Sequence, residues 1–199
     1  MTITATQVSE LHARTGAGMM DCKKALSETN GDIDAAIEHL RKTGIAKAEK
    51  KSDRDASEGL VHSYIHPGGR VGVLIQVSCE TDFVAKTDDF ITLVKDLAMQ
   101  VAATSPQSVR REEIAESIVA KEREVFLALM ADQKKPPQVM EKIIEGKLDK
   151  FFSEQCLLEQ VFIKDPDTKV DALVKLVSGK LGENIVVRRF ARFALGEGA

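Results

Sequence analysis

Apolar residues in the first 45 positions recur at the spacing of amphipathic helices, and turn residues divide them into three segments. A first helix is expected to end near Gly16 and a second at Asn30-Gly31. Asp32 can cap a third helix, which Gly44 is expected to close. Four apolar residues of this helix fall at i, i+3, i+4 and i+7: Ile33, Ala36, Ile37 and Leu40. The pattern predicts a minimal three-helix bundle.

The pattern changes after residues 47–59, a charged segment that is poor in large apolar side chains and is predicted to be a linker. Apolar residues then alternate over 60–65 and 71–77, which predicts two strands. Pro67-Gly68-Gly69 supplies the turn that joins them into a β-hairpin. One face of the second strand is expected to be apolar throughout, with Val71, Val73, Ile75, Val77 and Cys79.

Helical spacing returns after the hairpin and marks four segments, at 90–101, 114–129, 140–148 and 170–177. The apolar face of the second of these is expected to consist of Ile114, Ile118, Val125 and Leu129. The last is expected to end at Gly179 or Gly182, and residues 184–194 have the composition of a third strand.

The predicted fold class is therefore α+β. A small N-terminal three-helix domain, residues 1–50, precedes an antiparallel sheet of about three strands packed with helices, residues 55–199.

Composition is that of an ordinary globular chain, with 43% hydrophobic and 30% charged residues. The net charge of -3 gives no general attraction to nucleic acid or to an anionic membrane. No apolar run is long enough to cross a bilayer, and the N-terminus lacks the layout of a signal peptide. We therefore expect a cytoplasmic protein without membrane or direct nucleic-acid partners.

Three cysteines, Cys22, Cys79 and Cys156, are widely spaced and form no C-x-x-C pair. With only four histidines in the chain, this spacing predicts neither a disulfide framework nor a metal site, and no cofactor is expected. A Cys79–histidine nucleophile would need a thiolate, and burial on an apolar strand face makes a thiol inert. The chain is therefore not expected to be an enzyme.

Residues 79–86, C-E-T-D-F-V-A-K, join the second strand to a helix that Thr81 or Asp82 can cap. Two interpretations are open. In one, Phe83 belongs to the core and Asp82 is only a cap. In the other, the phenyl ring projects beside a carboxylate and inserts into a partner, as interface anchors commonly do.

Met19 and Met20 follow two glycines, and two adjacent methionines cannot both face one small core. One is expected to be exposed, where its flexible thioether suits contact with a partner. The alternative is an ordinary turn between helices with core methionines. Gly16 and Gly18 do not match a phosphate-binding loop, because the third glycine and the preceding strand are missing.

Arg188, Arg189 and Arg192 lie close together in the predicted last strand. In a net acidic chain they indicate salt bridges or an edge protected by charge, while nucleic-acid binding is the weaker interpretation.

The run R-T-G-A-G-M-M-D-C-K-K-A-L, residues 14–26, resembles the N-terminal signature of the bacterial elongation factor Ts family. The segment N-G-D-I-D-A-A-I-E-H-L-R-K-x-G continues that likeness, and residues 79–86 resemble the family's second signature. The closing F-A-L-G-E-G resembles the family's ending, so the resemblance extends from residue 3 to residue 198.

The resemblance implies a guanine nucleotide exchange factor of protein biosynthesis that binds elongation factor Tu with GDP or without nucleotide. A three-helix unit similar to ubiquitin-associated domains would dock on the GTPase through Met19, Met20 and Lys23. Thr81, Asp82, Phe83 and Val84 would enter near the nucleotide, where they disturb the Mg²⁺ and phosphate site.

Two departures from longer relatives accompany the resemblance. His12 stands where those relatives often carry an arginine contact. The S-Y-x-H run that ends at His66 resembles a hairpin contact found in the second of the two core halves of longer relatives. Long forms hold two related halves and this chain has room for one, so the resemblance implies a homodimer. The competing hypothesis is a ribosome- or RNA-associated binding protein without exchange activity.

Overall fold

The structure, a computed structural model, describes residues 3–130 and 136–197. Its contacts group into two compact units. The first is formed by the chain up to Leu60 with Val77–Leu93 and Ala172–Val186, and the second by Val61–Gln76, Val94–Asp171 and the chain from Val187 onward. The predicted division into residues 1–50 and 55–199 stays a prediction. No helix in the described ranges combines the length and apolar content that a membrane span requires.

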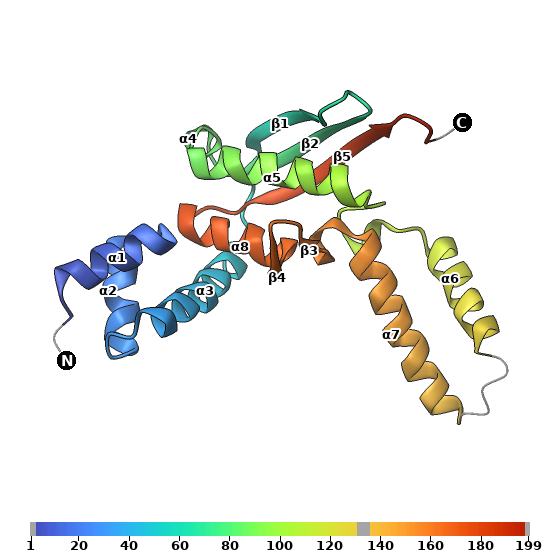
Figure 1. Ribbon diagram of the computed structural model, residues 1–199, viewed down its shortest axis with the longest axis horizontal. Helices are drawn as coiled ribbons and strands as arrows, with labels where there is room; N and C mark the ends of the chain where they lie inside the picture. The colour runs from blue at the N-terminus through green and yellow to red at the C-terminus, as the bar shows by residue number, and fades with distance from the viewer. Residues whose placement is uncertain (1–2, 131–135, 198–199) are drawn as a thin grey trace. The chain divides into compact units, whose positions relative to one another are not determined.

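The predicted three-helix bundle is present in the first unit (Figure 1), as α1 Ala5–Thr15, α2 Met19–Glu28 and α3 Ile33–Glu49. Thr4 begins α1 with a capping box, and Asp32 begins α3 by accepting a hydrogen bond from the amide of Ala35. Gly16 ends α1 at φ 64°, in the left-handed region that glycine tolerates best. The small core contains Val8, Leu11, Cys22, Ala25, Leu26 and Ala36.

Gly44 does not close the third helix, because α3 continues through it to Glu49. Gly44 instead lies against Gly179 of α8 (Val170–Leu181), and the backbones of the two glycines are in close contact. A Cβ atom on Gly179 would lie 2.5 Å from the carbonyl oxygen of Gly44. A glycine inside a helix costs conformational entropy, and in return the backbones of α3 and α8 can pack closely. Of the two expected ends of α8, the correct one is Gly182, at φ 78°.

The predicted hairpin and third strand are confirmed as β1 Glu58–Ile65, β2 Val71–Cys79 and β5 Val186–Ala194, in the order β1-β2-β5. Gly68 and Gly69 adopt positive φ angles in the turn, as its geometry requires. The apolar face of β2 is buried at Val73, Ile75, Val77 and Cys79. The α+β class with an antiparallel three-stranded sheet is thus confirmed. A second, two-stranded sheet of β3 Val161–Phe162 and β4 Asp165–Lys169 was not predicted.

The helix predicted after the hairpin is α5, Asp88–Thr104, preceded by the one-turn α4, Asp82–Ala85. The apolar residues that mark the predicted segment 90–101 are buried: Phe90, Leu93, Val94, Leu97 and Val101. Arg192 of β5 donates from Nε to the carbonyl of Ala102 at 3.3 Å, which joins the last strand to the end of α5.

The helices α6, Glu116–Leu129, and α7, Pro137–Gln155, pack on each other (Figure 1). The predicted face of α6 is wrong: Ile114 precedes the helix, and the other three residues of that stripe are exposed. Val119, Phe126 and Met130 face α7 instead. Apolar side chains lie on several sides of α6, so spacing alone could not select the face that carries Phe126. The helical segment predicted at 140–148 lies within α7, where Ile144 and Leu148 are buried.

Candidate functional site

The first candidate site is the turn between β2 and α4. Thr81 is extended and begins α4, because its Oγ1 accepts a hydrogen bond from the amide of Val84 at 3.4 Å. Ala85 on the inner side of the turn is buried, whereas Phe83 is 79% exposed. The interpretation of Phe83 as a core residue is therefore wrong. An aromatic ring this exposed at the tip of a capped turn is available to a partner.

Asp82 places a carboxylate beside that ring. It lies in the first turn of α4, and its Oδ2 accepts from Nζ of Lys86 at 2.6 Å. This hydrogen bond holds the pKa of Asp82 below its usual range and raises that of Lys86. At neutral pH the turn therefore presents an ionised carboxylate next to an exposed phenyl group.

A residue that the sequence did not single out, Glu183, contacts the base of the same turn. Its carboxylate accepts hydrogen bonds from the amides of Glu80 and Thr81, each at 3.0 Å, and from Thr81 Oγ1 at 2.6 Å. Glu183 follows Gly182, more than a hundred positions along the chain. No local pattern connects the two segments, so only the fold could reveal the contact.

Cys79 lies at the end of β2 and is fully buried. Burial, with the charge of Glu183 as a smaller cause, raises the pKa of its thiol to about 11. Its Sγ donates to the carbonyl of Thr81 at 3.1 Å. At neutral pH the group is a protonated, structural thiol and has no nucleophilic character. In the described ranges, no three His, Cys, Asp or Glu side chains are grouped as a metal site requires.

The second candidate site is one face of α2. Met20 is 78% exposed and Met19 47%, and Lys23 lies one turn further along on the same exposed side. We call these three residues the Met19–Lys23 surface. The expectation of an exposed methionine is confirmed and the alternative with core methionines is wrong, since the bundle core uses Cys22, Ala25 and Leu26 from α2. Both thioethers are therefore available for contact.

His12 and His66 have local partners. His12 is exposed on α1, and its Nδ1 donates to the carbonyl of Ala17 at 2.7 Å, which braces the chain between α1 and α2. His66 begins the hairpin turn in the second unit, with its Nδ1 3.1 Å from the hydroxyl of Tyr64.

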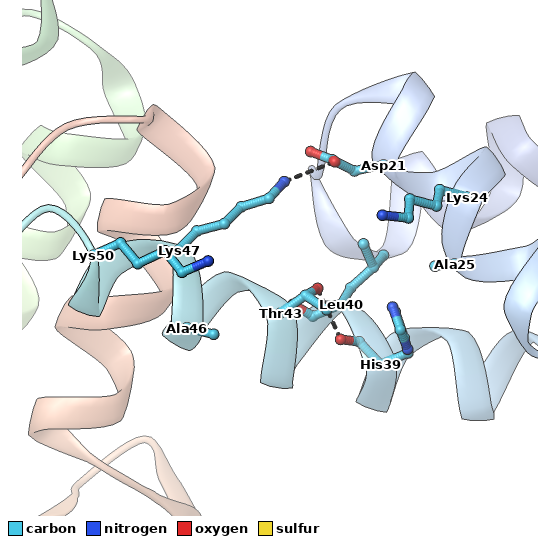
Figure 2. A pocket seen from close by; sticks show the side chains of 9 residues that line it. All are labelled: Asp21, Lys24, Ala25, His39, Leu40, Thr43, Ala46, Lys47 and Lys50. Carbon is cyan, nitrogen blue, oxygen red and sulfur yellow. Dashed lines mark hydrogen bonds and ion pairs between the residues drawn. The ribbon is translucent and has the colours of Figure 1, made fainter.

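Another side of α2 lines a pocket of about 220 Å³ against α3 (Figure 2). Three lysines line it, and two of them already have acidic partners. Lys47 lies 2.7 Å from Asp21 and Lys24 lies 3.9 Å from Glu28. These ion pairs oppose the binding of a further anion. The Met19–Lys23 surface is therefore a stronger candidate binding site than this pocket.

The outer face of the β1-β2-β5 sheet is unexpectedly apolar. Its exposed side chains are Val61, Ile65, Leu74, Phe193 and Leu195, and a shallow hollow of about 610 Å³ lies among several of them. Arg189 donates to Gln76 at 3.0 Å, and Arg192 pairs with Glu197 at 2.6 Å. These two arginines thus have the ordinary polar contacts that the sequence favoured.

The family model for Elongation factor TS matches residues 3–197. Curated proteins named "Elongation factor Ts" are similar over almost the whole chain. That of Moorella thermoacetica is 60% identical over 196 residues, 98% of this chain and 97% of the relative. That of Geobacter sulfurreducens is 56% identical over 198 residues, 100% of this chain and 92% of the relative. The chain belongs to the elongation factor Ts family.

Membership of the elongation factor Ts family confirms the resemblance carried by residues 14–26 and 79–86. Both candidate surfaces lie inside the part that matches the elongation factor Ts model. The chain covers 97% and 92% of the length of the two relatives described above.

Proposed function

We propose that this protein is the guanine nucleotide exchange factor of elongation factor Tu in translation, and that it acts in the cytoplasm without catalysing a reaction. It binds elongation factor Tu with GDP and promotes GDP release. The observation that carries the proposal is the exposed Phe83 beside the ionised Asp82, on a capped turn of a chain from this family.

The turn acts by favouring one state of the GTPase over another. Phe83 inserts into the GTPase near its nucleotide, and Thr81, Asp82 and Val84 accompany it. Asp82 brings a negative charge toward the site of Mg²⁺ and the phosphates. Loss of the metal removes the largest positive charge that balances the diphosphate, so GDP dissociates faster. Exchange follows because the factor binds the distorted or nucleotide-free GTPase more tightly than the GDP-bound form.

The Met19–Lys23 surface serves for docking. Two exposed methionines provide an adaptable apolar contact, and Lys23 adds a charge that orients the approach. His12, on the preceding helix, is a contact at the edge of this surface. His66 belongs to a separate contact made by the hairpin. Docking sets the affinity for the GTPase, whereas the turn at Phe83 sets the rate at which GDP leaves.

The outer sheet face is the place for a second copy of this chain. A three-stranded sheet with five exposed apolar side chains on one face buries that surface when two identical sheets stack about a two-fold axis. Phe193→Asp places a charge in the centre of this contact and should convert a dimer into a monomer in light scattering. A wild-type chain that scatters as a monomer of 21.8 kDa at tens of micromolar and is active would contradict the homodimer.

The alternative, a ribosome- or RNA-associated protein without exchange activity, has less support because the net charge is -3. Phosphate contacts would make RNA binding fall steeply with salt, and this can be measured directly.

The exchange proposal is tested by following a fluorescent GDP analogue as it leaves elongation factor Tu. Equimolar protein should accelerate release, and excess Mg²⁺ should oppose the acceleration. Release at the intrinsic rate, with micromolar protein present, would refute the proposal.

A further inference from the structure

Glu183 and Asn184 connect three segments of the first unit. Glu183 accepts from the amides of Glu80 and Thr81 and from the Thr81 hydroxyl. In the reverse direction, the amide of Asn184 donates to Oε1 of Glu80 at 2.7 Å. The two pairs of residues therefore hold each other reciprocally, through backbone and side-chain groups of both.

The third segment follows α3. Nδ2 of Asn184 donates to the carbonyls of Ser52 at 3.0 Å and Arg54 at 2.8 Å. Arg54 in turn lies 3.5 Å from the Glu80 carboxylate. The chain that leaves the three-helix bundle is thereby joined to the base of the turn that carries Phe83.

The Thr81 hydroxyl links this arrangement to the start of α4. A hydroxyl has one proton to donate, and the Thr81 hydroxyl donates it to the Glu183 carboxylate. An ionised carboxylate accepts hydrogen bonds and has no proton to donate. The lone pairs of the Thr81 oxygen are left to accept from the amide of Val84. Glu183 thus sets the direction of the hydroxyl in which Thr81 is an effective N-cap.

The short helix needs such support. A four-residue helix is far below the length at which helices are stable by themselves. Inside the turn, Ala85 is buried and Cys79 donates to Thr81. Phe83 is 79% exposed and is therefore held little by packing, so its direction depends on the backbone that Glu183 holds.

We infer that Glu183 and Asn184 are positioning residues for nucleotide exchange: they hold the turn from Glu80 to Val84 so that Phe83 meets the GTPase already ordered. The inference rests on the proposed exchange function. A turn ordered in advance does not lose conformational freedom when it inserts, and this loss would otherwise oppose the state from which GDP leaves. The Met19–Lys23 surface, which sets affinity, is independent of this contact.

Glu183→Gln tests the inference with little change of shape. The amide has one acceptor oxygen and presents an NH₂ donor where the carboxylate accepted. Because hydrogen bonds to a charged group are lost, the rate of GDP release at saturating protein should fall roughly tenfold. The half-saturating concentration should remain that of the wild type. Glu145→Gln, at an exposed position of α7, makes the same charge change and should alter neither quantity.

Two variants of Thr81 complete the test. Thr81→Ser keeps the hydroxyl and should keep the rate, whereas Thr81→Ala should lower it as Glu183→Gln does. The double variant Thr81→Ala/Glu183→Gln should be no slower than the slower single variant, because both remove one shared contact. Hydrogen exchange of the Val84 amide should quicken in Glu183→Gln, with the melting temperature of the whole chain preserved. If Glu183→Gln is unfolded by circular dichroism, the Ser and Ala variants of Thr81 decide the question.

A wild-type rate at saturation in Glu183→Gln, or a change confined to half-saturation, would overturn the positioning role. Equal rates in Thr81→Ser and Thr81→Ala would also overturn it. A wild-type protein without exchange activity would instead refute the proposed function itself, so the two failures are distinguishable.

Discussion

Replacing Phe83 by alanine should separate a loss of function from a loss of folding. The ring is 79% exposed in the free chain, so only about a fifth of it is removed from water by folding. If the ring is the anchor of the exchange turn, most of its burial takes place in the complex with the GTPase. The variant should therefore fold normally and exchange poorly.

The magnitude follows from the exposed fraction. Full burial of a phenylalanine side chain contributes about 1.5–3 kcal/mol. The folded chain realises about 0.3–0.6 kcal/mol of this, and about 1.2–2.4 kcal/mol remains for the partner. At about 1.4 kcal/mol for each factor of ten, kcat/KM for GDP release should fall roughly sevenfold to fiftyfold.

The assay is release of a fluorescent GDP analogue from elongation factor Tu across a range of protein concentrations, with thermal unfolding measured in parallel. Leu129→Ala is the matched control, because Leu129 is 69% exposed at the end of α6 and lies outside both candidate surfaces. It should exchange as the wild type does. Full activity in Phe83→Ala, or a large loss of stability with it, would refute the assignment of the ring to the interface.

Three further predictions concern other parts of the chain. Met20→Ala should raise the half-saturating concentration in the exchange titration and leave the saturated rate near that of the wild type. A lower saturated rate would contradict a docking role. Gly179→Ala should lower the free energy of unfolding by at least ~1 kcal/mol, because the new Cβ meets the Gly44 carbonyl. Gly146→Ala in α7 has open space and should raise it by up to ~1 kcal/mol; denaturant titration showing the reverse order would contradict the close crossing. Cys79 should react with a thiol reagent at pH 7 about a hundredfold more slowly than a free thiol on ionisation alone, because its pKa is raised from 9.0 to about 11. Rapid labelling of the folded chain would contradict this. Since the folded state holds the thiol proton more tightly, the associated stability is present below pH 9 and is lost as the pH rises toward 11.

Local signals in the sequence were sufficient for most of the elements. Asp32, Asn30-Gly31 and Gly68-Gly69 act through their own backbone angles and side chains, so helix starts and turns could be predicted without the fold. Alternation along β2 likewise determined which of its residues are buried.

The errors arose where a distant partner decides the outcome. Glycine commonly ends helices, yet Gly44 remains in α3 because Gly179 lies against it. The face of α6 depends on α7, which selects Phe126 and Met130 among several apolar positions. The contact of Glu183 with Thr81 joins residues that are 102 positions apart, and no spacing rule could have predicted it.

The candidate sites divide in the same way. Motif likeness drew attention to Phe83 and Met20, and periodicity had left each of them between core and surface. Exposure in the fold decides in favour of the surface for both. The apolar outer face of the sheet could not be read from β5, because its exposed Phe193 alternates with arginines that resemble a charged edge.

We expect this protein to turn over as an exchange factor. The most direct measurement adds it at a small fraction of the concentration of elongation factor Tu loaded with a fluorescent GDP analogue, with unlabelled GDP in excess. We expect that nearly all of the analogue is released, many molecules for each molecule of this protein and faster than the intrinsic rate. Release limited to one analogue per molecule added, or release at the intrinsic rate, would contradict this expectation.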